Sequence, residues 1–286
     1  SLKAEDENNI KQKKNSSHID SIQKNDQIYI RNDKLKNETY NKSLFSNQCS
    51  KVVMLNTGRY SSDVDTAETE NEEEHFIDEK LDQYIVAHSE NEPKHLKDLT
   101  RETYQKILQP RMLSGPYQGR VLSLISKLCN PRYILEIGTF TGYSALCLAE
   151  GLQNDGVLHT IEIDEELIDF QKKHFNNSPY KSKIKQHLGN AIDIIPSLDV
   201  SFDLIFIDAD KENYPNYFEL IIDKINPGGI ILSDNVLWSG KVVEPLNPKD
   251  TSTKALLAYN TLLKNDTRIE TVILPVRDGL TVSRKI

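Results

Sequence analysis

From Tyr133 onward the sequence alternates short apolar runs with amphipathic segments, and this alternation constrains the fold more than any other feature of the chain. A mostly parallel sheet with helices on both faces gives this pattern, because its strands are buried on both sides and its crossovers are helical. The predicted strands cover residues 133–137, 157–163, 184–188, 202–207, 229–232, 269–274 and 280–283. The predicted helices between them cover residues 142–152, 165–175, 191–198, 216–225 and 251–264.

The last two predicted strands differ from the others because only residues 275–279 connect them. That connection is too short for a crossover helix, so the two strands should form an antiparallel hairpin. The predicted fold class is therefore α/β, with a seven-stranded, mostly parallel sheet, an antiparallel hairpin at one edge and helices on both faces. Upstream, apolar spacing predicts helices near residues 76–86, 96–108 and 121–128, with a loop over residues 110–119.

The first part of the chain differs in composition from the rest. Residues 1–56 contain nine Asn, ten Lys or Arg and seven Asp or Glu, with few aliphatic residues to offset the entropy of ordering. Residues 57–75 hold seven acids and a single basic residue, Arg59, which is typical of a solvated linker. We therefore predict a low-complexity, disordered N-terminal extension over residues 1–75, which could be a targeting segment, and a folded domain over residues 76–286.

The charge and cysteine content of the predicted domain exclude several classes of partner. It carries 24 Lys and Arg against 29 Asp and Glu, and without a basic stripe nucleic acid is a disfavoured partner. Cys49, Cys129 and Cys147 are too widely spaced for a disulfide framework or a zinc site, which favours reduced thiols in the cytoplasm. No run approaches the roughly 18 apolar residues of a membrane span, so no membrane partner is expected.

Residues that could bind a nucleoside lie at the ends of the first three predicted strands. Gly138 and Gly142 lie where a doubly wound sheet binds a nucleotide-like ligand, although they could serve only a tight turn. Glu162 ends the second strand, where an acid can accept hydrogen bonds from two ribose hydroxyls, and Ala191 after the third would border an adenine. Together these signals favour an adenosine-containing cofactor. The spacing is not G-x-G-x-x-G, so the dinucleotide fingerprint is absent.

Carboxylate and amide side chains follow the fourth and fifth predicted strands. Asp208 and Asp210 follow the fourth strand, and Asp234 and Asn235 follow the fifth. Since these strands lie near the middle of the sheet, their ends should converge beside the cofactor. Two carboxylates and an amide oxygen suit Mg²⁺, with Mn²⁺ or Ca²⁺ as alternatives. An aspartate at a strand end can also cap the next helix, which is the competing interpretation of each residue.

Two stretches of the chain resemble the cation-dependent O-methyltransferases of the caffeoyl-CoA and catechol type. They are Met112-Leu-Ser-Gly-Pro-Tyr-Gln-Gly119 and Glu136-Ile-Gly-Thr-Phe-Thr-Gly-Tyr-Ser-Ala145. The resemblance covers about residues 78–286 and implies a Class I methyltransferase, Rossmann-like fold, whose layout of five parallel strands and an edge hairpin matches the one predicted. It also implies that S-adenosylmethionine contacts Met112, Ser114, Glu136, Gly138, Thr139, Ser144, Glu162, Ile163, Ala191, Asp208 and Asp210.

The same resemblance assigns the metal and the acceptor. Asp208, Asp234 and Asn235 match the family's metal ligands in identity and order, and Lys211 lies where catechol-type relatives place the lysine that removes the proton. Lys211 and Asp208 are thus the expected catalytic residues. Met112, Asp210 and Trp238 are expected to contact the acceptor, although Trp238 could equally be a core aromatic. Relatives usually form dimers, so a homodimer is expected. Arg277 replaces a small residue of the family pattern, at the rim of the acceptor site.

The implied function is metal-dependent transfer of the methyl group of S-adenosylmethionine to a hydroxyl of a catechol-like, caffeoyl-CoA-type phenolic small molecule. Three alternatives remain open at this point: a tRNA hydroxyuridine O-methyltransferase, an NAD-dependent oxidoreductase, and a catalytically silent cofactor-binding protein. The acidic domain disfavours the first, and the missing dinucleotide fingerprint and the hairpin disfavour the second. The intact set Asp208, Lys211, Asp234 and Asn235 disfavours the third.

Overall fold

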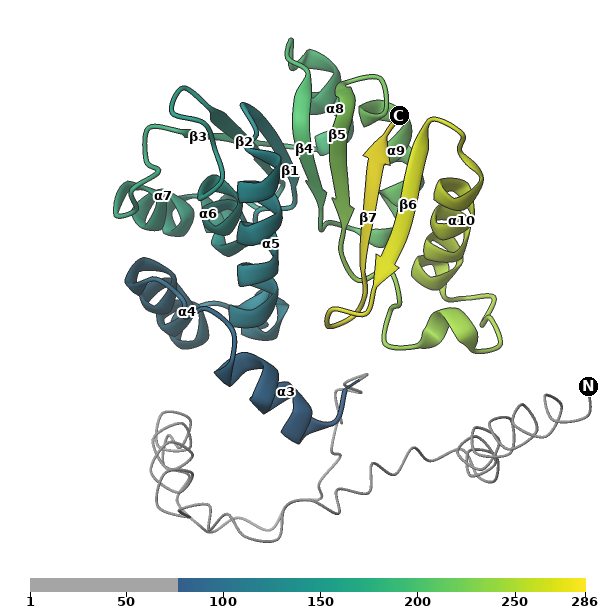
Figure 1. Cartoon of the computed structure of the whole chain (residues 1–286), viewed down its shortest axis with the longest axis horizontal. Coiled ribbons are helices and arrows are strands. Elements are labelled where there is room, and N and C mark those ends of the chain that lie inside the picture. The colour runs from purple at the N-terminus through teal and green to yellow at the C-terminus, as the bar shows by residue number, and fades with distance from the viewer. Residues whose placement is uncertain (1–76) are drawn as a thin grey trace, which may run out of the picture. The chain divides into compact units, whose positions relative to one another are not determined.

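A computed structural model of the chain describes residues 77–286, so the predictions for residues 1–75 lie outside the described residues. The described residues form one seven-stranded sheet with the order β3-β2-β1-β4-β5-β7-β6 (Figure 1). Its strands are β1 (Tyr133–Ile137), β2 (Val157–Glu162), β3 (Ile184–Leu188), β4 (Phe202–Ile207), β5 (Ile225–Ser233), β6 (Ile269–Leu274) and β7 (Leu280–Lys285).

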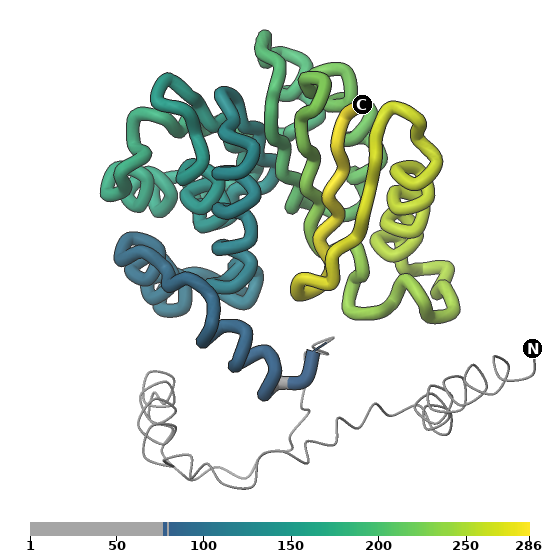
Figure 2. Tube along the Cα trace, viewed as in Figure 1, coloured from purple at the N-terminus to yellow at the C-terminus, as the bar shows by residue number. Residues whose placement is uncertain are grey.

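Strands β1 to β5 pair in parallel, and β7 runs antiparallel between β5 and β6. In the tube of Figure 2 the yellow C-terminal strand lies beside the green β5. The chain builds outward from β1 to β3 and then returns to the other side of β1 with β4, so the strand order reverses between β1 and β4. Ligands of doubly wound sheets bind at such a reversal, outside the carboxyl ends of the strands. The predicted fold class is confirmed, including the antiparallel hairpin at the edge.

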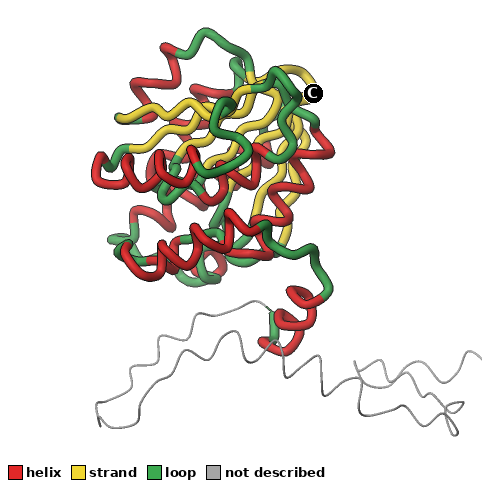
Figure 3. Tube along the Cα trace, turned by 90° about the vertical axis from the view of Figure 1, so that its left-hand side faces the viewer, coloured by secondary structure: helices red, strands yellow, loops and turns green. Residues whose placement is uncertain are grey.

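Helices cover both faces of the sheet, as the view in Figure 3 shows. They are α3 (Glu79–Ala87), α4 (Lys94–Lys106), α5 (Gly115–Cys129), α6 (Tyr143–Ala149), α7 (Ile168–Asn176), α8 (Ala191–Ser197), α9 (Tyr214–Ile221) and α10 (Thr251–Asn265). Because side chains alternate along a strand, Ile205 of β4 packs in the core with α8, α9 and α10, whereas its neighbour Phe206 packs in the core with α4, α5 and α6. No helix among residues 77–286 is long and apolar enough to cross a membrane.

Some of the predicted boundaries are wrong. Residues 110–119 were predicted as a loop, but they form the short 3-10 helix η1 (Pro110–Met112) and the first turn of α5. Pro116 stands in that first turn, where a missing N–H costs nothing, so proline opens the helix instead of excluding it. The helix predicted over residues 216–225 ends at Ile221, and β5 already begins at Ile225.

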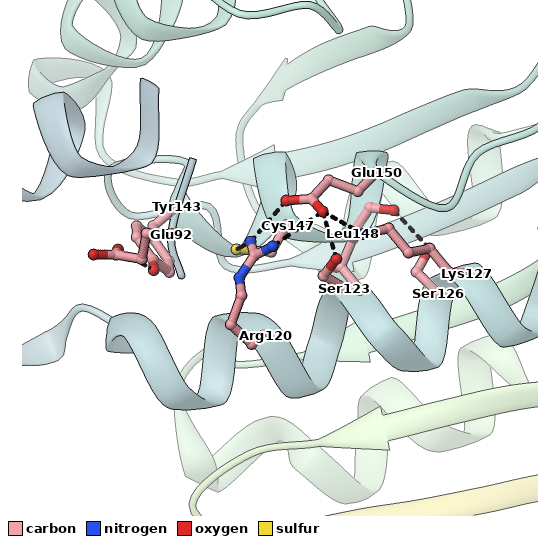
Figure 4. A network of polar contacts seen from close by, with 9 residues as sticks. All are labelled: Glu92, Arg120, Ser123, Ser126, Lys127, Tyr143, Cys147, Leu148 and Glu150. Atoms are coloured by element: carbon pink, nitrogen blue, oxygen red, sulfur yellow. Dashed lines mark hydrogen bonds and ion pairs between the residues drawn. The ribbon is translucent and has the colours of Figure 1, made fainter. Parts of the chain in front are cut away.

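Hydrogen bonds to Glu150, which lies at the end of α6, connect helix α5 to α6 (Figure 4). The Glu150 carboxylate accepts hydrogen bonds from Arg120 at 2.7 and 3.1 Å, from Ser123 at 2.6 Å and from Lys127 at 2.7 Å. Burial alone would raise the pKa of Glu150. The hydrogen bonds lower the pKa by more than burial raises it, so the net value is about 2. The axes can approach closely because residue 119 is glycine, where a Cβ would lie 2.6 Å from the Tyr143 ring. This contact sets the position of the α5 N-terminus beside the strand ends.

Candidate active site

The carboxyl ends of β1, β4 and β5 meet in one row. The N–H of Asp208 donates to the carbonyl of Ile137 on β1 at 2.9 Å, and the N–H of Asp234 donates to the carbonyl of Ile207 on β4 at 3.0 Å. The N–H of Gly138 donates to β2 in the same way, at 3.1 Å. The first residues after the strands are therefore neighbours across the sheet, so the glycine loop lies directly beside Asp208, and Asp234 follows on the other side of Asp208.

Gly138 is the tightest point of this row. Its φ of +95° lies in the left-handed region, and a Cβ at this position would lie 2.0 Å from the carbonyl oxygen of Asp208. Only glycine meets both conditions, because it has no side chain and adopts positive φ without strain. The glycine therefore lets the loop after β1 lie directly against the loop after β4.

Asp234 is a buried carboxylate, with 2 % of its surface exposed. Its Oδ1 accepts the N–H of Asn235 at 2.8 Å, and its Oδ2 accepts the side-chain amide of Gln118 at 2.6 Å. Burial and the nearby charge of Asp208 raise the pKa of Asp234 above its ordinary value. Two carboxylates in this position repel each other, and a cation between them would remove that repulsion.

Lys211 is the basic side chain that lies beside this pair. Its side chain is 8 % exposed, and Nζ lies 3.1 Å from Asp208 Oδ1. Nζ also donates to the hydroxyl of Tyr214 at 2.7 Å, and that hydroxyl donates to the backbone carbonyl of Asp234 at 3.0 Å. The lysine is thus held by both strand ends. Tyr214, which opens α9, fixes its position.

Asn235 follows Asp234 with a left-handed backbone, at φ +56°. It lies near Asp278 in the β6–β7 hairpin, where the Asn235 side chain lowers the pKa of that carboxyl but burial raises it by more. Within residues 77–286 no cluster of three or more His, Cys, Asp and Glu could hold a metal ion. The expected ligand set contains only two such residues and the Asn235 amide.

Trp238 lies half-buried next to the same lysine. The centroid of its ring is 5.8 Å from Lys211 Nζ and 5.9 Å from Lys241 Nζ, and its Nε1 is buried without a hydrogen-bond partner among the described residues. The ring also packs against the core formed with α8, α9 and α10. Trp238 is therefore partly a core aromatic, and its ring also lies beside Lys211, while its contact with an acceptor stays a prediction.

Glu162 stands at the end of β2, as predicted for a ribose ligand. Its carboxylate accepts the N–H groups of Phe140 at 2.7 Å and of Ile163 and Asp164 at 2.9 Å each, and the Gln171 amide at 3.3 Å. Burial raises the pKa of Glu162, and the backbone hydrogen bonds oppose that shift. A ribose would share these oxygens with the protein donors, of which Gln171 is the most distant.

Glu136 is completely buried at the end of β1. Its Oε2 accepts the Thr160 hydroxyl at 2.5 Å, whereas Oε1 has no hydrogen-bond partner among the described residues. Burial raises the pKa of Glu136 to about 8, although the hydrogen bond from Thr160 opposes the shift. An unpaired carboxyl oxygen next to the glycine loop fits a ligand with a donor or a positive charge.

The remaining predicted residues lie around this row. Thr139 and Ser144 are buried in the loop after β1 and at the start of α6, Ala191 is buried at the start of α8, and Ile163 is exposed after β2. Ser114 is buried before α5, and Met112 is 56 % exposed. Asp210 is exposed, but its carboxylate accepts hydrogen bonds from the Tyr217 hydroxyl and the Asn213 amide, both at 2.5 Å. A shallow hollow on α10 contains none of these residues; it is lined by Leu257, Ala258, Thr261, Leu262, Asn265 and Asp266.

Gln118 is the main site residue that the sequence analysis missed. It is completely buried and binds Asp234, although it belongs to a different element. A signal was present, because Gln118 lies one helical turn before Leu122 and two before Ser126, and both are also completely buried. A glutamine on the buried stripe of a helix needs polar partners.

The sheet order, the glycine loop after β1 and the acid at the end of β2 are those of Rossmann-like methyltransferases. Residues 86–286 match the family model described as O-methyltransferase. A caffeoyl-CoA O-methyltransferase of Stellaria longipes is 34 % identical over 220 residues, which is 73 % of this chain and 91 % of the relative. The chain therefore belongs to the S-adenosylmethionine-dependent O-methyltransferase family.

Two solved structures are similar over the same part. An O-methyltransferase from Streptomyces achromogenes involved in tomaymycin synthesis, in complex with S-adenosylmethionine, has a TM-score of 0.67 and 29 % identity, and the match covers 72 % of this chain and 96 % of that one. An O-methyltransferase from Bacillus cereus in complex with S-adenosylhomocysteine has a TM-score of 0.68 and 28 % identity, with coverages of 72 % and 97 %. The predicted family, fold and enzyme class are confirmed.

Proposed function

We propose that this chain is a metal-dependent O-methyltransferase that acts on a catechol-like phenolic small molecule. The observation that carries the proposal is the pair of carboxylates, Asp208 and Asp234, on adjacent strand ends with Lys211 beside them. The relatives named caffeoyl-CoA O-methyltransferase support the acceptor class. Membership of the O-methyltransferase family favours methyl transfer over the oxidoreductase alternative.

Asp208, Asp234 and the amide oxygen of Asn235 would hold the cation. All three donors are oxygens, the ligand type that Mg²⁺ prefers, and the repulsion between the two carboxylates gives a bound cation a clear benefit. A divalent ion at this position would hold the two adjacent oxygens of a diol and favour the ionised form of one of them. Mg²⁺ is the proposed ion, with Mn²⁺ or Ca²⁺ as alternatives.

The protein groups around the acceptor have separate roles in this proposal. Lys211, as the neutral amine, would receive the acceptor proton; its Nζ lies 3.1 Å from Asp208 and 2.7 Å from Tyr214, which supports this role. The face of Trp238 borders the acceptor ring, and Met112 and Asp210 lie at the rim. Fixing the acceptor oxygen in line with the methyl group converts an encounter of two molecules into a single oriented step.

S-adenosylmethionine supplies the methyl group in this proposal, and the loops after β1, β2 and β3 hold it. Glu162 accepts the ribose hydroxyls, Ala191 borders the adenine, and the unpaired oxygen of buried Glu136 faces the cationic part of the cofactor. Gly138, Thr139, Ser144 and Ile163 line the path between them, with Met112, Ser114, Asp208 and Asp210 on the acceptor side. A positive charge next to Glu136 would favour the ionised carboxylate.

The proposal is tested by a methyl-transfer assay with catechol, caffeate, caffeoyl-CoA and hydroxyuridine tRNA as acceptors. S-adenosylhomocysteine formation is measured with Mg²⁺, with EDTA, and with Mg²⁺ restored. We expect turnover on a vicinal-diol phenol that EDTA abolishes and Mg²⁺ restores. Turnover that survives EDTA would contradict the metal assignment, and turnover on tRNA alone would contradict the acceptor class.

Two substitutions test the proposed roles of Asp234 and Lys211 in this assay. Asp234→Asn should lower Mg²⁺-dependent kcat/KM by at least about 100-fold, because it removes one of two charged ligands. Lys211→Met should lower kcat by about 100-fold or more, the usual effect of losing a general base. Asp223→Asn is the matched control, because Asp223 is an exposed aspartate after α9, and its kcat/KM should equal that of the unsubstituted chain.

We also propose a homodimer and a cytoplasmic location, as the family resemblance implies. Leu124 and Leu128 stand one turn apart on α5 and are 59 % and 77 % exposed, which supports a contact between copies on this face. Light scattering on the purified chain measures the oligomeric state. A monomer at all concentrations would contradict the dimer.

A further inference from the structure

We infer that Arg277 and Gln118 form a positioning relay that presets the carboxylate of Asp234. Arg277 belongs to the loop between β6 and β7, Gln118 belongs to α5, and Asp234 follows β5. The relay consists of two consecutive hydrogen bonds, from Arg277 to Gln118 and from Gln118 to Asp234. The inference rests on the proposed function, because it takes Asp234 as a metal ligand.

The chemistry of the three groups fixes the direction of the relay. A guanidinium only donates hydrogen bonds, a carboxylate only accepts them, and an amide has one side of each kind. Arg277 Nη1 lies 3.2 Å from Gln118 Oε1, and Gln118 Nε2 lies 2.6 Å from Asp234 Oδ2. With Arg277 on one side and Asp234 on the other, the amide of Gln118 has only one satisfactory orientation.

Because Gln118 and Asp234 are buried, the orientation of the Gln118 amide decides whether Asp234 Oδ2 has a hydrogen-bond partner. Gln118 is 0 % exposed and Asp234 is 2 % exposed, so water cannot replace a lost partner of the Oδ2 oxygen. The other oxygen of Asp234 accepts the N–H of Asn235 at 2.8 Å. Both oxygens are therefore held by the protein before any cation binds, and the carboxylate cannot rotate freely.

Arg277 also joins the relay to the segment before α5. The same Nη1 atom also donates to the backbone carbonyls of Leu113 at 3.0 Å and Ser114 at 2.5 Å, so that its two hydrogens serve three acceptors and one of them is shared. Both residues are 5 % exposed, and they follow Met112 at the proposed acceptor rim. One guanidinium thus fixes the rim segment and, through Gln118, the Asp234 carboxylate. A small residue at position 277, as in the family pattern, could make none of these hydrogen bonds.

The relay predicts how metal affinity responds to substitution. We expect Gln118→Met, which keeps the side-chain length but removes both hydrogen bonds, to raise the Mn²⁺ dissociation constant about 10- to 100-fold. Arg277→Met should also raise the Mn²⁺ dissociation constant. Arg277→Lys should raise it less than Arg277→Met does. Because both residues act through one amide, the double variant Gln118→Met/Arg277→Met should bind Mn²⁺ no more weakly than Gln118→Met alone.

Mn²⁺ binding is measured by paramagnetic resonance of the free ion during titration of the full chain, with no acceptor and no turnover. Thermal unfolding of each variant shows that it is folded at the assay temperature. Arg284→Met is the matched control, since Arg284 is on β7 and forms an ion pair with exposed Glu270, at 3.6 Å. Its Mn²⁺ affinity should be unchanged.

The outcomes separate the relay from the function on which it rests. Mn²⁺ affinity lost in Asp234→Asn but unchanged in Gln118→Met and Arg277→Met would overturn the relay and leave the ligand assignment standing. Effects of the two substitutions that multiply in the double variant would also overturn it. Unchanged affinity in Asp234→Asn would overturn the ligand assignment, and the relay with it.

Discussion

At residue 138 the backbone adopts a conformation that only glycine reaches without strain, and a side chain there would collide with the neighbouring strand end. Gly138→Ala should therefore destabilise the fold by more than about 1 kcal/mol, because it combines a positive φ with a Cβ 2.0 Å from the Asp208 carbonyl. Urea unfolding measures the difference.

The control for this substitution is Gly115→Ala. Gly115 has a φ of +76°, but a Cβ there would have nothing within 4 Å, so this variant has the strain of a side chain at positive φ without a collision. The difference between the two variants isolates the collision with Asp208. Equal destabilisation would show that the loop after β1 can move away from the loop after β4.

Residues at strand ends were predictable from the sequence, whereas their partners from other elements were not. Asp208 and Asp234 follow buried strands, and the rule that parallel strands end at one edge suffices to bring them together. Their assigned roles stay predictions. The contacts of Asp234 with Gln118 and of Gln118 with Arg277 join residues 116 and 159 positions apart in the chain. No local pattern encodes these pairings, since they depend on how α5 crosses the sheet.

Among the elements, the α5–α6 contact has a predictable response to pH. The pKa of Glu150 is about 2 in the folded protein, below the 4.5 of an ordinary glutamate, so the unfolded chain binds this proton more tightly. The resulting stabilisation, about 2–3 kcal/mol, is complete above pH 4.5 and is lost as the pH falls towards 2.

Glu150→Gln tests this assignment by urea unfolding at several pH values. At pH 7 the variant should be less stable by about 3 kcal/mol, because Arg120 is left buried without its charged partner. The gap should narrow as the pH falls below 4.5. Glu244→Gln, at an exposed glutamate, should stay within about 0.5 kcal/mol of the unsubstituted chain at every pH. A gap that does not change with pH would refute the role of the Glu150 charge.

The strands were predicted well where apolar runs are continuous, and poorly where a turn signal lies inside a strand. Pro227, Gly228 and Gly229 are typical of a turn, and the fifth strand was predicted to start at residue 229. In the structure β5 starts at Ile225, because its register against β4 shifts there. Phe202 pairs with Ile225 but Leu204 pairs with Ile230, and this irregularity absorbs the proline and the glycines.

For the whole molecule, the folded unit should not need the first 76 residues. A chain of residues 77–286 should unfold cooperatively, with a melting temperature within a few degrees of the full chain, since both cores lie within that range. The shorter chain should also keep the methyl-transfer activity of the full chain, with S-adenosylmethionine as the donor. Differential scanning calorimetry and the methyl-transfer assay check both expectations. Loss of the cooperative transition would show that residues before 77 contribute to folding.

The position of β7 between β5 and β6 affects how the chain reaches its native state during synthesis. β6 leaves the ribosome before β7, yet β7 is the only strand with which it pairs in the described sheet. Until β7 arrives, the free edge of β5 and the whole of β6 have unpaired backbone groups, which invite association with other chains. A premature stop before residue 280 would therefore leave one edge of β5 and both edges of β6 open to aggregation.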